Sequence, residues 1–152
     1  MKKIGLFPGS FDPFTKGHEV VVRKSLQLFD EVVIGVGVNS KKSSLFDLDK
    51  RIMHIESLFK DTDKVRVTKF QMLTVNFCKE IGAQLIIRGL RDSNDFSYER
   101  SIAHMNYEIA EIDTVFFLTE QRYTAISSTI IREIHQNKGK IDAFVTNPDL
   151  LV

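Results

Sequence analysis

The residues best suited to chemistry in this chain lie near its beginning, at Pro8-Gly9-Ser10-Phe11 and Thr15-Lys16-Gly17-His18. An apolar run that ends in Gly-Ser and leads into a helical pattern predicts a strand, a tight turn and a helix start. Such a turn points backbone N–H groups and a helix dipole at an anion. His18 then falls in the first helical turn, where a cationic or hydrogen-bonding imidazole suits phosphoryl or nucleotidyl transfer. Gly-Ser alone also fits an ordinary loop, but the Gly17-His18 spacing favours a functional site.

Two arginines three residues apart, Arg88 and Arg91, follow a second apolar run. The planar guanidinium fork binds phosphate through two parallel hydrogen bonds, and Gly89 would let the backbone approach a ligand closely. The alternative is a pair of surface arginines in salt bridges with Asp92 and Asp95. Because both arginines come at the end of a predicted buried strand, we expect them to bind phosphate.

Three further segments carry polar groups that could serve the same site. Asp95 is expected to cap the next helix, and Glu99 could accept hydrogen bonds from a ribose or organise an arginine. Ile126-Ser127-Ser128-Thr129 begins another helix, with Ser127 as its cap, and offers hydroxyls and free N–H groups to a second anion. Lys42 lies in a loop from which an ammonium could reach a phosphate, although a solvated loop lysine is the commoner case.

Other kinds of site are disfavoured by what the sequence contains. His54, His104 and His135 fall within helical patterns, and no Cys/His cluster has zinc spacing. Cys78 lies in an apolar helical stretch and is interpreted as a core residue. The chain has no Walker A motif, no dinucleotide-binding Gly-x-Gly-x-x-Gly and no nucleophile elbow. A set of phosphate donors without a clear nucleophile suits direct displacement between two bound substrates, promoted by positioning and charge neutralisation.

Short apolar runs alternate with longer helical patterns along the chain, which predicts an α/β fold. We expect a doubly wound, Rossmann-like parallel sheet of five strands with helices on both faces, formed by a single domain, 1–152. Ligands bind such sheets beyond the carboxyl ends of the strands, where all the polar segments above would meet. The expected strands are 3–7, 32–38, 65–70, 85–87 and 114–118, and the expected helices are 17–29, 48–59, 74–81, 96–110 and 128–136, followed by a short helix after residue 139.

The composition sets limits on partners and compartment. Formal net charge is +1 over 152 residues with no long run of one sign, so we expect no nucleic-acid partner. No apolar stretch approaches the ~20 residues of a membrane span, and no signal peptide is visible. A single cysteine excludes an internal disulfide and favours a reducing compartment such as the cytoplasm.

Taken together, three motifs resemble bacterial phosphopantetheine adenylyltransferases, over residues 3 to about 139. These are Pro8-Gly9-Ser10-Phe11-Asp12-Pro13 with Thr15-x-Gly17-His18, the segment from Arg88 to Glu99, and Ile126-Ser127-Ser128-Thr129. The first and last are shared across the nucleotidylyltransferase superfamily, whereas the middle one is specific. The resemblance implies in-line transfer of AMP from ATP to 4′-phosphopantetheine, with Mg²⁺, giving dephospho-coenzyme A and pyrophosphate in coenzyme A synthesis. It also implies a homohexamer.

The resemblance further implies roles for individual residues. His18 would stabilise charge on the pentavalent transition state, and Ser10 and Lys42 would hold the reacting phosphates as its catalytic partners. The residues implied to bind phosphopantetheine are Ser10, Lys42, Thr74 and Arg88, with Thr74 on the pantetheine arm and Arg88 on the phosphate. The residues implied to bind ATP are Gly9, Ser10, Phe11, His18, Gly89, Leu90, Arg91, Glu99, Tyr123, Thr124, Ala125, Ile126, Ser127, Ser128 and Thr129. No protein ligand to a metal is expected.

This sequence departs from the family pattern at three places. Ser10 stands where threonine is common but keeps the hydroxyl, Thr74 stands where many members are apolar, and Thr119-Glu120 replaces a common Met-Pro. Two other functions stay open at this point: a nucleotidylyltransferase for nicotinamide mononucleotide or a phosphorylated polyol, and a nucleotide or coenzyme A sensor without turnover. The segment from Arg88 to Glu99 argues against the first, and an intact His18 against the second.

Overall fold

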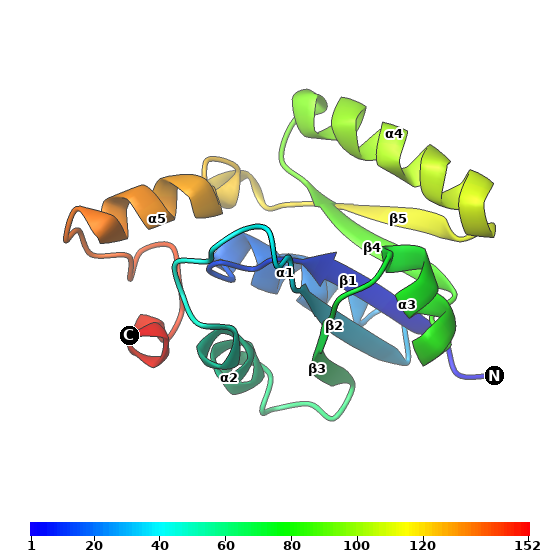
Figure 1. Cartoon of the computed structure of the whole chain (residues 1–152), viewed down its shortest axis with the longest axis horizontal. Helices are drawn as coiled ribbons and strands as arrows, with labels where there is room; N and C mark the ends of the chain where they lie inside the picture. The colour runs from blue at the N-terminus through cyan, green and yellow to red at the C-terminus, as the bar shows by residue number, and fades with distance from the viewer.

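The computed structural model describes residues 1–152, which form one five-stranded sheet with helices on both faces (Figure 1). All neighbouring strands are parallel, and their order is β3-β2-β1-β4-β5. This order confirms the predicted doubly wound, Rossmann-like architecture, and it places the reversal of winding between β1 and β4. The strands are β1 (Ile4–Gly9), β2 (Glu31–Gly37), β3 (Val65–Phe70), β4 (Leu85–Leu90) and β5 (Asp113–Leu118).

Two apolar layers fasten the helices to the sheet. Successive strand residues point to opposite faces, so Phe7 and Ile87 pack with α1 and α2, whereas Leu6 and Ile86 pack with α3. A third, smaller cluster joins α5 to the C-terminal segment, which ends in a short 3₁₀ helix. The helices are α1 (Lys16–Ser25), α2 (Leu48–Leu58), α3 (Thr74–Ile81), α4 (Ser93–Ala110) and α5 (Ser128–Gln136), and the 3₁₀ helices are η1 (Gln121–Tyr123) and η2 (Pro148–Leu151).

Several element boundaries differ from those predicted. β1 and β4 continue to Gly9 and Leu90, so Pro8 and Arg88 lie within strands rather than after them. The cap of α4 is Asp92, whose carboxylate accepts a hydrogen bond from the Asp95 N–H; the prediction that Asp95 caps this helix is wrong. Asp95 bonds Arg91 instead, because its place in the first turn turns its carboxylate towards the end of β4.

The long helix α4 lies along β4 and β5 and leaves most of its surface uncovered by this chain (Figure 1). Its single buried residue is Glu99. The apolar side chains that it exposes are Phe96, Tyr98, Ile102, Met105, Tyr107 and Ile109. None of the helices combines the length and the apolar character that a membrane crossing requires.

Candidate active site

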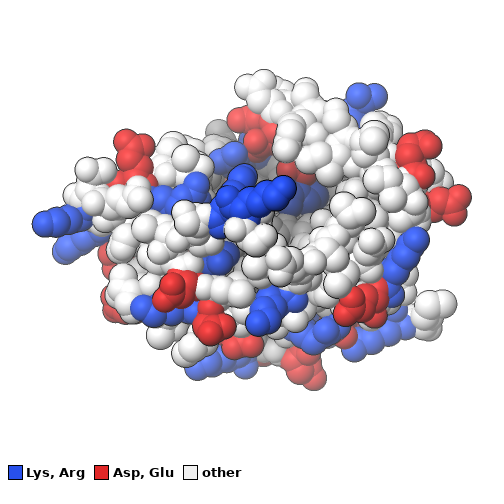
Figure 2. Space-filling view, viewed as in Figure 1, with Lys and Arg blue, Asp and Glu red and all other residues white.

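A cleft of about 450 Å³ opens where β1 and β4 separate. The two strands pair at Gly5 with Leu85 and at Leu6 with Ile86, and no further. Beyond that point each strand pairs only with its outer neighbour. In Figure 2 the view shows a hollow near the centre of this face, with basic side chains gathered at its border. The cleft is lined by Phe7, Pro8, Gly9, Ser10, Phe11, Thr15, Gly17, His18, Val21, Arg88, Gly89, Arg91, Asp95, Glu99, Thr119, Tyr123, Ser127, Ser128 and Thr129.

His18 is fixed by the start of α1. The Thr15 hydroxyl accepts a hydrogen bond from the His18 N–H, and His18 Nδ1 accepts one from the Thr15 N–H at 2.9 Å. This reciprocal arrangement is a capping box with an imidazole in the place usually taken by Glu or Gln. Because Nδ1 accepts, the ring proton lies on Nε2, which is left as a donor for a ligand.

The surroundings of His18 keep its imidazole neutral. The ring packs against three phenylalanines, with centroids 5.1 Å from Phe11, 5.2 Å from Phe14 and 6.1 Å from Phe7. Burial, with a smaller contribution from the charges of Arg88 and Arg91, lowers the pKa of His18 to about 3. Of the two forms that the sequence left open, the structure therefore favours a neutral hydrogen-bond donor over an imidazolium.

Two buried charged residues hold the turn after β1, and the sequence analysis did not identify them. The carboxylate of Asp12 accepts hydrogen bonds from the backbone N–H groups of Leu45 and Phe46, each at 2.9 Å. Arg51 donates to the carbonyls of Ser10 and Phe46. The only sequence signal for this role is that a carboxylate sits in the Gly-Ser-Phe-Asp-Pro turn, which does not reveal its partners.

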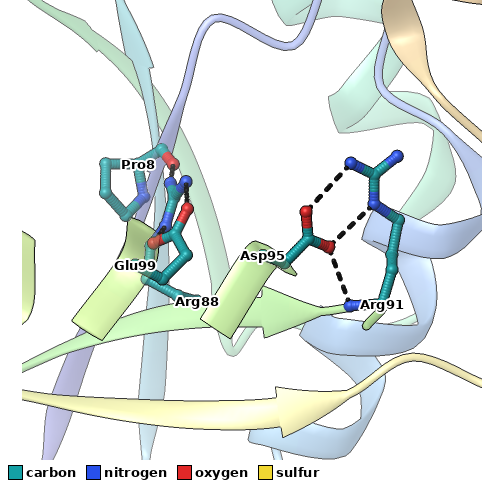
Figure 3. Close-up of polar contacts among 5 residues, drawn as sticks. All are labelled: Pro8, Arg88, Arg91, Asp95 and Glu99. Carbon is teal, nitrogen blue, oxygen red and sulfur yellow. Dashed lines mark hydrogen bonds and ion pairs between the residues drawn. The ribbon is translucent and has the colours of Figure 1, made fainter. Parts of the chain in front are cut away.

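Arg88 and Arg91, at and just after the end of β4, each form an ion pair with an acidic residue from the first two turns of α4 (Figure 3). Arg88 donates from Nε and Nη2 to the two oxygens of Glu99 at 2.7 and 2.6 Å, and from Nη1 to the Pro8 carbonyl at 2.6 Å. Arg91 donates to Asp95 through Nε and Nη2 and to the Ile126 carbonyl through Nη1. The salt bridge considered for Asp95 is thus present, and the arginines still line the cleft.

Gly89 lies between these arginines and serves the fold as well as the cleft. A Cβ atom at this position would come within 2.6 Å of the Val21 side chain on α1. We predicted that Gly89 would allow a ligand to approach; its backbone does line the cleft, but the close neighbour in this chain is the helix that carries His18.

The N-terminus of α5 also lines the cleft. Ser127 occupies the N-cap position as predicted, but its side chain makes no capping hydrogen bond. The Ser128 hydroxyl donates to the Pro13 carbonyl, and the Thr129 hydroxyl accepts from Arg132, which also donates to the Asp12 carbonyl. The Ser128 hydroxyl and Arg132 therefore tie α5 to the turn after β1. The first N–H groups of α5 have no partner within the helix and belong to a segment, 127–129, that lines the cleft.

A second, smaller cavity of about 250 Å³ adjoins the cleft. Its wall combines apolar side chains with a few amide and hydroxyl groups. It shares four residues with the larger cleft: Pro8, Gly9, Arg88 and Glu99. The other lining residues are Gly37, Phe70, Thr74, Ile86, Ile102, Ala103, Asn106 and Thr114. The site therefore has two compartments with the Arg88–Glu99 ion pair at their boundary.

The structure gathers most of the predicted site residues but not all of them. Those lining one of the two cavities are Gly9, Ser10, Phe11, His18, Thr74, Arg88, Gly89, Arg91, Glu99, Tyr123, Ser127, Ser128 and Thr129. Those lining neither are Lys42, Leu90, Thr124, Ala125 and Ile126. Lys42 is exposed on the loop after β2, Leu90 is buried, and Ile126 contributes its carbonyl to Arg91.

The acidic side chains of the larger cleft are Asp95 and Glu99, and each is engaged by an arginine. No group of three His, Cys, Asp or Glu side chains is placed to hold a metal ion. Both carboxylates of the cleft are committed to arginines, so this donor set does not fit a resident metal centre. It fits the binding of anionic phosphates.

Comparison with known proteins assigns the chain to a family. Residues 6–134 match the cytidylyltransferase-like family model. A phosphopantetheine adenylyltransferase of Cytophaga hutchinsonii is 51% identical over 146 residues, which are 95% of this chain and 97% of that protein. The chain belongs to the phosphopantetheine adenylyltransferase family. A second member, from Lachnoclostridium phytofermentans, is 49% identical over 95% of this chain and 90% of its own length.

A solved structure shows that the fold extends beyond this family. A Vibrio parahaemolyticus protein, provisionally named a nicotinate-nucleotide adenylyltransferase, matches with a TM-score of 0.71 at 22% identity. The match covers 99% of this chain and 92% of that one. The family assignment confirms the resemblance drawn from the three motifs, of which the segment from Arg88 to Glu99 is the specific one. It also agrees with a cleft built from phosphate donors.

Proposed function

We propose that this phosphopantetheine adenylyltransferase family member transfers the AMP group of ATP to the phosphate of 4′-phosphopantetheine. The products are dephospho-coenzyme A and pyrophosphate, and the reaction is a step of coenzyme A biosynthesis. The observation that carries the proposal is the pair of adjoining cavities with Arg88 at their boundary. Such a site can hold two phosphate-bearing substrates with their reacting groups side by side.

In this proposal the larger cleft binds ATP and directs its α-phosphorus towards the acceptor. An oxygen of the acceptor phosphate attacks in line, and pyrophosphate leaves from the opposite side. The attacking phosphate is already an anion, so the reaction needs no general base. The Nε2–H of His18 donates to an oxygen of the pentavalent phosphorus, where negative charge accumulates. Ser10, Arg91 and the N-terminus of α5 support the departing phosphates.

The smaller cavity suits the pantetheine arm, which has both apolar methylene and methyl groups and two amides. Phe70, Ile86 and Ile102 provide apolar surface there, and Thr74 and Asn106 provide hydrogen-bonding groups. We assign the acceptor phosphate to Arg88, at the mouth of this cavity. We also assign Lys42 to the reacting phosphates, which requires its exposed loop to close over the bound substrates.

We propose that magnesium enters as the complex that it forms with the phosphates of ATP. Mg²⁺ keeps several waters and is commonly bound by substrate phosphates with few protein ligands. Asp95 and Glu99 are committed to arginines, so the metal would neutralise phosphate charge as part of the substrate. The contribution of the chain is then to bind and orient that complex.

We further propose a homohexamer, as the family resemblance implies, working in the cytoplasm, as the single cysteine favours. The exposed apolar side chains of α4, among them Phe96, Tyr98 and Met105, are candidates for burial between subunits because exposed apolar patches often mark interfaces. Light scattering coupled to size-exclusion chromatography measures the assembly directly. A mass of one chain would contradict the hexamer and leave the proposed reaction unaffected.

The proposed reaction is tested by pyrophosphate release with ATP, magnesium and one acceptor at a time. The acceptors are 4′-phosphopantetheine, nicotinamide mononucleotide and glycerol 3-phosphate. Release with phosphopantetheine alone is the expected result. Release with another acceptor would retain adenylyl transfer and reject the substrate, and tight ATP binding without release from any acceptor would favour a sensor.

A further inference from the structure

We infer that Glu99 is a positioning residue: it holds the Arg88 guanidinium so that one N–H on each terminal nitrogen remains directed at the acceptor phosphate. The inference rests on the proposed function, because it concerns how that acceptor is held. It assigns to Glu99 an action through Arg88 in place of a direct contact with the nucleotide.

Arg88 keeps two N–H groups that no acceptor within the chain takes up. A guanidinium has five N–H groups, one on Nε and two on each terminal nitrogen. Three are used within the chain: Nε and Nη2 donate to Glu99, and Nη1 donates to the Pro8 carbonyl. One N–H therefore remains on Nη1 and one on Nη2. Two donors on neighbouring nitrogens are what a phosphate group accepts in the bidentate manner.

Glu99 has little capacity left for a second partner. Both of its oxygens accept from Arg88, and its side chain is only 10% exposed, whereas that of Arg88 is 32% exposed. A ribose hydroxyl could bond Glu99 strongly only by competing with a charge-assisted, two-pronged ion pair. Figure 3 shows the Glu99 carboxylate facing the Arg88 guanidinium. The carboxylate therefore acts on the substrates through the arginine that it fixes.

Arg91 and Asp95 repeat the arrangement on the nucleotide side. Three Arg91 N–H groups go to Asp95 and the Ile126 carbonyl, which again leaves one N–H on each terminal nitrogen. Asp95 and Glu99 are four residues apart, so they share one face of α4 and meet Arg88 in β4 and Arg91 directly after it. The Arg88–Glu99 pair lines both cavities, whereas Arg91 and Asp95 line only the larger one. Loss of Glu99 should therefore weaken binding of the acceptor more than binding of the nucleotide.

The experiment is a double-mutant cycle on adenylyl transfer, with KM measured separately for 4′-phosphopantetheine and for ATP. The variants are Glu99→Ala, Arg88→Ala and the double variant, and Glu108→Ala is the control for losing an exposed acid of the same helix. Glu99→Gln keeps the shape and one acceptor oxygen, so it remains informative if the alanine variant folds poorly. Glu99→Ala should raise the acceptor KM on the order of tenfold to a hundredfold through misplacement of Arg88. Glu99→Gln should fall between it and the wild type.

The decisive readout is coupling between the two sites. If Glu99 acts through Arg88, Glu99→Ala will not raise the acceptor KM further once Arg88 is alanine. A rise in the ATP KM that persists without Arg88 would show a direct nucleotide contact and overturn the inference. A fall in the acceptor KM would show that Glu99 only offsets positive charge, and would overturn it as well. If the wild type is active and Glu99→Ala has unchanged kinetics, the positioning role of Glu99 is refuted and the proposed function is not. If the wild type is inactive with phosphopantetheine, the proposed function itself is refuted.

Discussion

Replacing His18 by alanine removes two separate contributions, and the structure allows each to be sized. His18 lines the cleft with its Nε2–H available to a ligand, and its Nδ1 closes the capping box at the start of α1. The first contribution belongs to the transition state and the second to the folded state. A single variant therefore changes activity and stability together, and a second variant is needed to separate them.

The expected magnitudes follow from these contacts. Loss of one preorganised donor to developing charge lowers kcat on the order of 10²–10³-fold, equivalent to about 2.7–4 kcal/mol. Loss of the capping interaction costs about 1 kcal/mol, and loss of the ring from the cluster of Phe7, Phe11 and Phe14 costs about 1 kcal/mol more. The two structural losses lower Tm by about 4–8 °C for a chain of this size.

The assay compares His18→Ala with His18→Gln by steady-state pyrophosphate release and thermal unfolding. The Gln carboxamide can accept the Thr15 N–H, as in the usual capping box, but it lacks the ring that carries a second donor into the cleft. We expect His18→Gln to recover roughly half of the lost Tm, from the restored cap, while kcat stays low in both variants. Recovery of kcat in His18→Gln would refute the reasoning, because it would assign the effect to the helix start.

Four further predictions concern His18, Gly89, Asp12 and Cys78. The pKa of His18 is lowered to about 3, so its contribution to stability is complete above its ordinary pKa of 6.5 and is lost as pH falls from 6.5 towards 3. Between pH 7 and pH 5 the free energy of unfolding in urea should therefore fall less in His18→Gln than in the wild type, and equal falls would contradict this prediction. Gly89→Ala should lower the free energy of unfolding by about 1–3 kcal/mol through overpacking, because the new Cβ would lie 2.6 Å from the Val21 side chain, and Val21→Ala should relieve that loss. If denaturant melts show that the losses of the two variants simply add, this contact is not the cause. Asp12→Ala should lower the free energy of unfolding by about 2–5 kcal/mol, because two backbone N–H groups lose their acceptor. An unchanged free energy of unfolding would show that Asp12 does not hold this turn. Burial raises the pKa of the Cys78 thiol to about 11, so a thiol reagent at pH 8 should react with Cys78 only after unfolding. Fast labelling of the native protein would show that Cys78 is not buried.

Local signals were sufficient where no distant partner was needed. β3 (Val65–Phe70) and α3 (Thr74–Ile81) have the predicted bounds, and Gly82 ends α3 with a φ of 72°, as a left-handed cap should. The parallel order of the sheet followed from alternation of strands and helices. Convergence of the polar segments followed in turn, because the carboxyl ends of parallel strands meet at one edge.

Long-range pairings could not be predicted from neighbouring residues. The carboxylate of Asp95 looked like a helix cap, but Asp92 takes that role and leaves Asp95 for Arg91. Nothing near Asp12 in sequence reveals that its carboxylate binds backbone N–H groups 33 and 34 residues away. The positions of Lys42 and of the segment from Thr124 to Ile126 depend on loop paths, and loop paths leave no periodic pattern in a sequence.

The prediction that β1 ends before Pro8 failed for a reason that also explains the site. Proline lacks a backbone N–H and is excluded from the interior of a sheet unless no partner is required on that side. Within a strand the N–H and the C=O of one residue point to the same side, and the Pro8 carbonyl points to Arg88 of β4. The missing N–H therefore falls where the ladder between β1 and β4 has already ended, at Leu6 and Ile86. Pro8 cannot extend that ladder, yet it stays in register with Gly35 of β2, because the residues on either side of it direct their backbone groups towards β2. The residue that looked like a strand terminator thus allows the strands to part, and its carbonyl, which accepts from Arg88 and from no strand, helps to orient the arginine between the two cavities.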